Sequence, residues 1–363
     1  MYVDKIFFQD WRNLADLSFR LDTATNVFLG QNAQGKTNIL EAINFASLLR
    51  SRAGRESRLI RWGQSVARVR IAYVKAGISH ELAIEISVDK PRRIFLDGNL
   101  IRPRELIGKL NSVLFSPEDL FLFKGSPQGR RKFLDAQISQ ASPVYFMDLL
   151  RYNRLVDQRN VLLKKIRYCE VDESELDIWD EQLAFAAEKL LTKRLAVVEK
   201  LNRLANAIHE KISAHKENLS VRYSMSGLYS RKNIAQKFYD MLKTRRDDDI
   251  RNGSTGKGPH RDDLKFSIND MELKLYGSQG QLRTTALAMK LSELKFIRDE
   301  TGEYPLLLLD DVMSELDAER RELLLEFLSR EKIQTLITAT DRAYFPPVIF
   351  GKLFRVQAGR LIE

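Results

Sequence analysis

The chain has 363 residues, enough for two domains or for one large domain that carries an insertion. Apolar residues make up 44% of it and charged residues 30%, which excludes an intrinsically disordered chain and indicates a folded protein with a sizeable core. The net charge of +10 favours an anionic partner, of which nucleic acid is the commonest large one.

The lone cysteine, Cys169, excludes a disulfide within the chain and favours a reducing compartment. The first residues, MYVDKIFFQDW, carry acids and lack the long apolar core of a signal peptide. No apolar run approaches the roughly 18 residues that a membrane-spanning helix requires. We therefore expect a cytoplasmic protein with no membrane partner.

The first thirty residues predict short β-strands that lead into a glycine-bearing loop. VDKIFF and DLSFRL alternate weakly between apolar and polar residues, and TNVFLG is an apolar run that ends in a glycine. GQNAQGKT follows, and then NILEAINFASLL, whose apolar residues recur at helical spacing. Strand, glycine loop and helix in this order are the context of a phosphate-binding loop.

A second group of predicted strands follows a basic stretch. VRIAYVKAG and HELAIEISV alternate, and RRIFLDGNLI contains an Asp97-Gly98 turn signal. The pattern therefore predicts antiparallel hairpins that accompany the phosphate loop.

The middle of the chain has a different pattern, because its apolar residues recur at helical spacing. The longest such segment runs from about Asp177 to His215. We therefore expect residues 141–250 to form an all-helical insert. It would separate an N-terminal part of the phosphate-loop domain, residues 1–140, from a C-terminal part, residues 251–363.

The C-terminal part returns to β pattern, in DLKFSIND and MELKLYGS, before an amphipathic helix that opens on GSQGQ. EYPLLLLDD is a continuous apolar run typical of a strand buried in a parallel sheet, and IQTLITAT is another. The predicted fold class is α/β, a phosphate-loop domain with mixed sheets and an inserted helical second domain.

GQNAQGKT matches the pattern G-x-x-x-x-G-K-[ST] in full. Its glycines let the backbone wrap closely around a phosphate, Lys36 would meet the β- and γ-phosphates of a nucleotide, and Thr37 would hold Mg²⁺. A chance match is disfavoured by the strand before the loop and the helix after it. The residues expected to bind the nucleotide here are Gly30, Gln31, Asn32, Ala33, Gln34, Gly35, Lys36, Thr37 and Asn38.

Two aspartates directly follow the apolar run LLLL. Asp310 would be the second ligand of the metal ion. Asp311 could orient or deprotonate the attacking water, so Asp311 and Lys36 are the expected catalytic residues. An aspartate is a shorter arm than a glutamate and hints at slow hydrolysis. Without the phosphate loop, either aspartate would be interpreted as an ordinary acid at a strand end.

The loop GSQGQ raises a separate question. Unpaired backbone N–H groups and the helix dipole favour an anion at a helix N-terminus of this kind. A phosphate is already accommodated by the loop from Gly30 to Thr37, so it is not evident from the loop alone which phosphate the second helix would bind.

These motifs together resemble the ABC-type ATPases and, within them, the branch of SMC proteins and Rad50, in which two ATPase half-motifs flank a helical insertion. Six stretches resemble the RecF family of bacterial recombination mediators more closely, and the insert is far too short for an SMC coiled coil. The stretches are RNL at 12–14, FSPEDL at 115–120, GRRKFLD at 129–135, GPHRDD at 258–263, SQGQLRT at 278–284 and LLLLDDVMSELD at 306–317.

The resemblance implies further contacts with ATP. Arg12 and Asn13 would lie near the nucleotide. Ser278 and Gly280 would form the signature loop, which contacts the γ-phosphate of ATP held by a second copy of the protein. The GSQGQ loop would therefore be idle in a monomer and used twice in a dimer. The stretch SELD at 314–317 would cross the dimer interface.

The resemblance also implies a function. The protein would bind ATP and Mg²⁺, dimerise on ATP, and bind gapped DNA or junctions of single and double strands. With RecR as its partner it would promote RecA loading in recombinational repair and replication restart. Its ATPase would be weak, stimulated by DNA, and used as a switch that resets the dimer.

Two features of transporter ATPases are missing. Thr338 or Thr340 stands where transporter ATPases carry a switch histidine, and FSPEDL lacks the glutamine of their inter-lobe loop, for which Glu118 or Asp119 could substitute. These departures count against the alternative function, the ATPase subunit of a membrane transporter. The single cysteine excludes the CxxC zinc hook of a Rad50-like protein.

Two basic clusters are candidate contacts to the DNA backbone. One follows the phosphate-loop helix, and the other is Arg130, Arg131 and Lys132. Such contacts would be salt-dependent and independent of base sequence, and pairing with carboxylates is the alternative for any single residue. The long helix could likewise be a partner surface or could pack against the first insert helix. The members of the first cluster are Arg50, Arg52, Arg55, Arg58 and Arg61.

Overall fold

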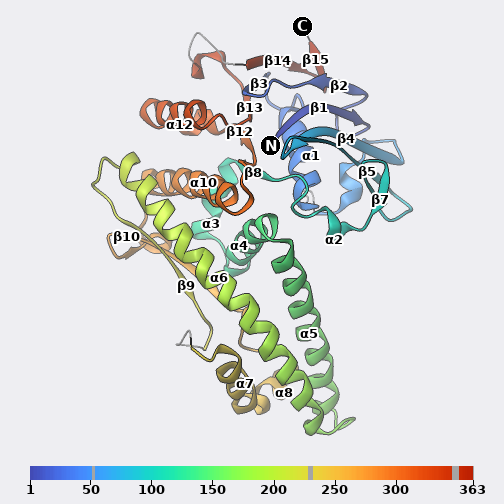
Figure 1. Cartoon of the computed structure of the whole chain (residues 1–363), viewed down its shortest axis with the longest axis vertical. Coiled ribbons are helices and arrows are strands. Elements are labelled where there is room, and N and C mark those ends of the chain that lie inside the picture. The colour runs from blue at the N-terminus through green and yellow to red at the C-terminus, as the bar shows by residue number, and fades with distance from the viewer. Residues whose placement is uncertain (51–53, 228–231, 346–350, 363) are drawn as a thin grey trace. The chain divides into compact units, whose positions relative to one another are not determined.

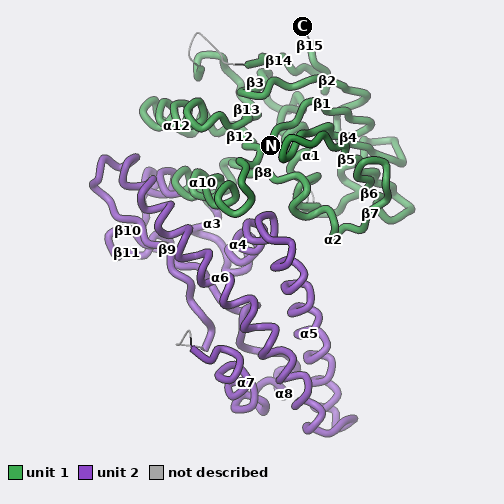
Figure 2. Tube along the Cα trace, in the orientation of Figure 1, with its two compact units in different colours: residues 1–120, 286–363 green, residues 121–285 purple. Residues whose placement is uncertain are grey.

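The computed structural model describes residues 1–50, 54–227, 232–345 and 351–362. The chain forms two compact units, unit 1 of residues 1–120 and 286–363 and unit 2 of residues 121–285 (Figure 2). Each unit has its own buried apolar cluster and its own β-structure, so the two are described separately.

Within the described residues, unit 1 contains two six-stranded sheets (Figure 1). The strands of the first are β1 (Tyr2–Gln9), β2 (Leu17–Arg20), β4 (Val66–Lys75), β5 (Ile78–Ser87), β6 (Arg93–Leu96) and β7 (Asn99–Ile101). The strands of the second are β3 (Thr25–Leu29), β8 (Ser112–Phe115), β12 (Leu306–Asp310), β13 (Thr335–Ala339), β14 (Gly351–Gln357) and β15 (Arg360–Ile362). The predicted mixed sheets are confirmed.

The first sheet has the order β2-β1-β4-β5-β6-β7 and is antiparallel throughout. The predicted hairpin between β6 and β7 is present, and Asp97 and Gly98 have positive φ angles of 51° and 80°. Both residues of the commonest two-residue hairpin turn need positive φ, which is why an Asp-Gly pair stands here.

The second sheet has the order β15-β14-β3-β13-β12-β8 and is parallel from β14 to β8. Every residue of β12 and β13 is buried. A strand covered on both faces needs a continuous apolar run rather than an alternating one, so LLLL and its neighbour TLITA meet this requirement.

The helix α1 (Lys36–Leu48) packs against β8, β12 and β13 of the second sheet and against β4 of the first. Its apolar residues, among them Ile39, Leu40, Ile43 and Phe45, belong to one buried cluster that contains residues of both sheets. The other helices of unit 1 are η1 (Glu56–Leu59), α2 (Pro103–Leu106), η2 (Pro117–Leu120), α11 (Val312–Glu315), α12 (Ala318–Glu331) and η4 (Arg342–Tyr344).

Unit 2 is built on two long helices, α5 (Pro143–Arg167) and α6 (Leu176–Ile212), which lie side by side (Figure 1). The remaining helices are α3 (Phe121–Lys124), α4 (Pro127–Ala141), η3 (Glu173–Glu175), α7 (Ile234–Thr244), α8 (Arg246–Asn252) and α9 (Leu273–Tyr276). The helix α10 (Gln279–Thr301) begins in unit 2 and ends in unit 1. Among the described residues, no helix is long and apolar enough to cross a membrane.

The insert is not all-helical, which corrects the prediction from the sequence. The strands β9 (Leu219–Ser224), β10 (Asp263–Ile268) and β11 (Met271–Glu272) form an antiparallel sheet, and β9 packs on α6. Of MELKLY, only the first two residues are strand, because a helical turn follows from Leu273. β9 was missed because strand pairing with β10 joins segments that are distant in sequence.

The bounds of the insert also differ from the predicted 141–250. Helix α4 packs on α5 and on β10, so residues on both sides of the predicted boundaries belong to unit 2. The predicted long helix is confirmed as α6. It packs against α5, α7 and β9, and Leu183, Leu190 and Leu201 are fully buried, so simple packing accounts for its apolar residues.

The stretch GPHRDD is a structural junction of unit 2. Gly258 has a φ of 128°, and a Cβ there would lie 2.7 Å from the Phe238 ring, so glycine is required. His260 Nδ1 lies 2.7 Å from the Tyr152 hydroxyl, and its Nε2 lies 2.9 Å from the carbonyl oxygen of Thr255. This motif, which supported the family resemblance, therefore holds helices and loops of unit 2 together.

Candidate nucleotide site

The phosphate loop follows β3, and Asp310 ends β12, with β13 between these two strands. Thr338 of β13 is in register with Asp310 on one side and with Phe28 on the other. The carboxyl ends of parallel strands lie at one edge of the sheet, so the loops that follow them meet there. The strand order thus brings together motifs that are about 270 residues apart, as Thr37 and Asp310 are separated by 273 positions.

Two hydroxyl groups hold the Asp310 carboxylate. Thr37 Oγ1 donates to Asp310 Oδ1 at 2.8 Å, and Thr338 Oγ1 donates to the same oxygen at 2.9 Å. Thr338 Oγ1 also accepts the backbone N–H of Asp311 at 2.9 Å. Of the two candidate threonines, Thr338 therefore lies in the site and orients both aspartates, whereas Thr340 follows the end of β13. The sequence alone did not predict this orienting role.

Lys36 is buried, and its ammonium group donates to carbonyl oxygens of its own loop. The distances are 2.6 Å from Nζ to Gly30 O and 2.8 Å to Gln31 O. Burial lowers the pKa of Lys36, and the nearby carboxylates of Asp311 and Asp310 oppose this effect. A desolvated ammonium held by neutral carbonyls is well suited to accept an anion.

Asp311 has a backbone φ of 54°, an unusual conformation for a residue other than glycine. Its Oδ1 is buried and has no hydrogen-bond partner in the part of the chain that the structure describes. Burial raises the pKa of Asp311, Lys36 opposes the rise and Asp310 adds to it. A buried, unpaired carboxylate oxygen of this kind can accept a proton or orient a water molecule.

Loop residues 32–38, with Asp311 and Thr338, line a pocket of about 330 Å³. A larger cavity of about 1060 Å³ lies beside α12 and shares no residue with the phosphate loop. We place the candidate site at the smaller pocket, because Lys36 and Asp311 converge there.

The segment RNL packs directly on the phosphate loop. Asn38 Nδ2 donates to Asn13 Oδ1 at 2.8 Å, and a Cβ on Gly35 would lie 2.7 Å from that same oxygen. Gly35 also has a φ of 106°, so glycine is needed for conformation and for space. Arg12 Nη2 donates to Glu41 Oε1 at 2.7 Å, which anchors the segment on α1.

The rest of the loop is partly fixed and partly open. Gln34 accepts the backbone N–H of Ala358 through its side chain at 2.7 Å and that of Gly359 through its carbonyl at 2.9 Å. The side chains of Gln31, Asn32 and Ala33 are exposed. These three residues are therefore more open to solvent than Gln34, which is held by hydrogen bonds.

The donor set suits Mg²⁺. Thr37 Oγ1 and Asp310 Oδ1 are the hard oxygen ligands that this ion prefers, and they adjoin each other. No group of three or more His, Cys, Asp or Glu side chains that could hold a metal occurs among the described residues. Two protein ligands suit an ion whose coordination is completed by phosphate oxygens and water.

Ser278 and Gly280 belong to unit 2, at the start of α10. Ser278 Oγ accepts the backbone N–H of Gln281 at 3.2 Å, and Gln281 Oε1 accepts that of Ser278 at 3.0 Å. This reciprocal capping box explains the spacing of serine and glutamine in SQGQ. A Cβ on Gly280 would meet only Ser278 Oγ, at 3.9 Å, so nothing in the chain requires glycine there.

The candidate sensor residue Asp119 is already engaged. Asp119 Oδ2 accepts the backbone N–H of Ser116 at 2.8 Å, and Oδ1 lies 2.8 Å from Lys290 Nζ. Glu118 is exposed on the same turn. Both carboxylate oxygens of Asp119 are therefore occupied within unit 1, and Asp119 does not reach outward as a substitute for the glutamine of transporter ATPases.

In the second basic cluster, Arg130 has a carboxylate partner, which is the alternative that the sequence left open for any single residue. Its guanidinium is buried and pairs with both carboxylate oxygens of Asp263, at 2.7 and 2.8 Å. Arg131 Nη1 donates to the carbonyl oxygen of Asp262 at 2.6 Å. Arg130 thus joins α4 to β10 within unit 2. In the first cluster, Arg52 lies outside the described residues.

The family model for the RecF/RecN/SMC N terminal domain matches residues 2–358. The DNA replication and repair protein RecF of Halothermothrix orenii is 44% identical over 350 residues, which cover 94% of this chain and 92% of that protein. The protein of the same name from Enterococcus faecalis is 41% identical over 373 residues, which cover 99% and 98%.

Solved structures give the same result. The recombination mediator protein RecF with ATP, described as part of the RecFOR pathway, has a TM-score of 0.92 at 36% identity, over 99% of this chain and 97% of that one. An Smc head domain from Pyrococcus furiosus, at 17% identity and a TM-score of 0.57 over 99% and 96% of the two chains, shares the fold alone. The predicted head-like fold is thus confirmed, and the chain belongs to the RecF family.

Proposed function

We propose that the chain is an ATP-dependent DNA-binding protein whose ATPase works as a switch. The observation that carries this proposal is the pocket lined by Lys36, Thr37 and Asp311. Asp310 is bonded to Thr37, and a buried oxygen of Asp311 has no hydrogen-bond partner among the described residues. Groups that lack partners within the chain are available to a ligand.

The roles follow from the atoms that each residue presents. The backbone of the loop from Gly30 to Asn38 would surround the phosphates, and Lys36 Nζ would exchange its carbonyl contacts for phosphate oxygens. Thr37 and Asp310 would hold Mg²⁺, which supplies charge neutralisation of the phosphates. Asp311 would act as the base for the attacking water. Arg12 and Asn13 would support the loop from the side.

A dimer that forms on ATP is the second part of the proposal. Gly280 has room for a side chain and an ordinary backbone conformation, so its glycine suits the close approach of a group from outside the chain. The exposed N-terminus of α10 suits a phosphate. We propose that Ser278 and Gly280 meet the γ-phosphate of ATP bound to a second copy.

The relatives supply the biological setting. Their names place RecF in DNA replication and repair, and the solved structures place it in the RecFOR pathway as a recombination mediator. We propose that the chain binds gapped or junction DNA, partners with RecR, promotes RecA loading in the cytoplasm, and hydrolyses ATP slowly under stimulation by DNA. The alternative of a transporter ATPase finds no support among the relatives.

Light scattering with and without ATP tests this proposal. We expect an ATP-dependent dimer for the wild type, and for Ser278→Arg a monomer that still binds ATP, because the arginine blocks the approach of the second copy. Ser174→Arg adds the same side chain at another exposed serine of unit 2 and should dimerise normally. Normal dimerisation of Ser278→Arg would exclude the proposed role of the GSQGQ loop.

A further inference from the structure

Trp62 is 99% exposed, more than any other large apolar side chain among the described residues. Tryptophan normally buries roughly 150–250 Å² of surface, and the ring of Trp11 in the same unit is completely buried. A large aromatic ring left in water is available for a partner and marks an interaction site.

The backbone that carries Trp62 is held firmly. The N–H of Gln64 donates to the carbonyl of Arg61 at 3.0 Å and closes a turn around Trp62 and Gly63, and Gly63 has a φ of 82°. The N–H of Arg61 donates to Asp10 O at 2.8 Å. The exposed ring therefore sits on a fixed turn, and its exposure does not result from a loose chain.

A short antiparallel pairing connects the residues just before this turn to the segment beside the phosphate loop. The N–H of Arg12 donates to Leu59 O at 2.7 Å, and Trp11 forms a β-bridge with Ile60. Leu59 and Ile60 are buried and anchor the turn. A base bound at Trp62 would thus lie two residues along the chain from Ile60. Ile60 and Leu59 pair with Trp11 and Arg12, and the proposed function places Arg12 near the nucleotide.

The surroundings of Trp62 are positively charged. Between positions 50 and 64 the sequence contains five arginines and a single acid, Glu56, which pairs with Arg92. Arg55, Arg58 and Arg61 are exposed. An exposed aromatic ring among arginines has the composition of surfaces that bind nucleic acid, in which arginines contact phosphates and the ring stacks on a base.

We infer that Trp62 stacks on an unpaired or terminal DNA base at a junction of double and single strands, while neighbouring arginines contact the backbone. Inside a duplex both faces of every base are already stacked, so only a junction, gap or end presents a free face. This inference rests on the proposed binding of gapped or junction DNA and deepens it, because it names the side chain and the free base face through which the DNA is recognised.

Two DNAs of the same duplex sequence test the inference in the presence of ATP. One is a covalently closed circular duplex, which has no ends, nicks or loops, and the other is the same circle with a single-stranded gap. We expect Trp62→Ala to weaken binding to the gapped circle by roughly 5- to 150-fold, the range for loss of one stacked base, and to change binding to the closed circle by less than about twofold.

Two further variants sharpen the measurement. Trp62→Phe keeps an aromatic face and should retain most of the preference for the gap. Tyr168→Ala removes another exposed aromatic ring, in unit 2, and should bind both DNAs as the wild type does. Binding of gapped DNA should also quench tryptophan fluorescence in the wild type, and this quenching should disappear in Trp62→Ala.

The outcomes separate this inference from the proposed function. If the wild type binds both DNAs and Trp62→Ala loses affinity equally for both, or for neither, base stacking by Trp62 is excluded. Loss of the ATP-dependent dimer in Trp62→Ala would assign the ring to a protein contact instead, and overturns the inference too. If the wild type with ATP binds neither DNA, the proposed DNA binding itself fails.

Discussion

Both units bury charged groups, but the two units differ in how many hydrogen-bond partners those groups find within the chain. In unit 2, all three nitrogens of the Arg194 side chain donate, to Asp135, to the hydroxyl groups of Tyr145 and Tyr223, and to the carbonyl oxygen of Pro259. In unit 1, Lys36 donates to carbonyl oxygens of its own loop, and a buried oxygen of Asp311 has no partner among the described residues. The Arg194 cluster therefore stabilises unit 2, whereas Lys36 and Asp311 remain available to a ligand.

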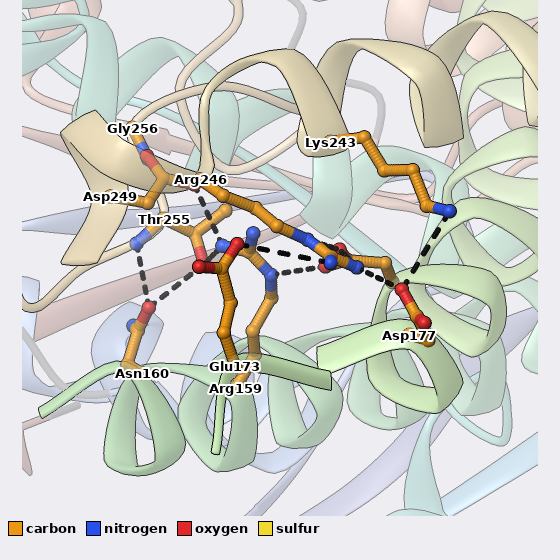
Figure 3. Close-up of polar contacts among 10 residues, drawn as sticks. Arg159, Asn160, Glu173, Asp177, Lys243, Arg246, Asp249, Thr255 and Gly256 are labelled. Atoms are coloured by element: carbon orange, nitrogen blue, oxygen red, sulfur yellow. Dashed lines mark hydrogen bonds and ion pairs between the residues drawn. The ribbon is translucent and has the colours of Figure 1, made fainter. Parts of the chain in front are cut away.

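A second cluster of unit 2 also pairs buried charges with one another, although Arg159 Nη2 has no hydrogen-bond partner among the described residues (Figure 3). Arg159 is fully buried, and it donates to Asp180 Oδ1 and Asp249 Oδ2, both at 2.7 Å. Arg246 reaches Asp180 from the other side, at 2.7 Å, and so joins α8 to α6. These pairs tie together helices that are distant in sequence. Such pairs are costly to bury, and removal of one partner is more costly still.

The sharpest test of the comparison is Lys36→Ala. We expect ATP binding and ATP-dependent dimerisation to be lost, because the variant lacks the cation that meets the phosphates. The melting temperature without ATP should hardly change, since the hydrogen bonds of Lys36 within the described part of the chain go to carbonyls of its own loop. Calorimetric titration with ATP and thermal unfolding measure the two effects. Wild-type affinity for ATP would contradict the assigned role.

Arg159→Ala should have the opposite profile. It leaves Asp180 and Asp249 buried without their common partner, so we expect unfolding to become easier by about 3–5 kcal/mol. Denaturant unfolding without ATP measures this loss. Arg251→Ala, which removes an exposed pair with Asp248, is the matched control and should change stability by less than about 1 kcal/mol. Equal effects of the two variants would refute the comparison.

Asp311→Asn tests the unpaired oxygen. The amide keeps the size of the side chain but cannot accept a proton from water, so we expect ATP binding to persist and turnover to fall by at least about 100-fold. The dimer should remain closed after ATP is added. Phosphate release, followed together with particle size, gives both results. Hydrolysis at the wild-type rate would show that another group serves as the base.

The smallest expected effect is a pH dependence at His260. Burial lowers the pKa of His260 to about 4, against 6.5 for the ordinary side chain, and its hydrogen bond to Thr255 opposes the shift. Between these values the unfolded chain binds a proton that the folded chain does not. Stability is therefore full above pH 6.5 and falls as the pH drops towards 4, by roughly 1 kcal/mol per pH unit.

His260→Gln should flatten this part of the pH profile, because the amide does not titrate. Since carboxylates also titrate in this range, the informative quantity is the difference between variant and wild type in denaturant unfolding at several pH values. His215→Gln, at an exposed histidine, should keep the wild-type profile. Identical profiles for wild type and His260→Gln would mean that His260 is not buried in its neutral form.

The phosphate loop and the two aspartates could be predicted from the sequence because each is a contiguous motif with its strand beside it. Thr338 could not be assigned its role, because its bonds to Asp310 and Asp311 depend on which strand lies between β3 and β12. The partner of Arg130 could not be predicted for the same reason, since Asp263 lies 133 positions away.

The sequence by itself determined the chemistry of the loop GQNAQGKT, the buried strands and the long helix α6, because local spacing dictates backbone conformation and which residues must avoid water. Only the tertiary structure decided which buried charges find partners within the chain and which remain available to a ligand. It also decided that the insert contains a sheet, and that Trp11 is buried while Trp62 is exposed. Those outcomes depend on which distant segments pack together, and no local pattern encodes that choice.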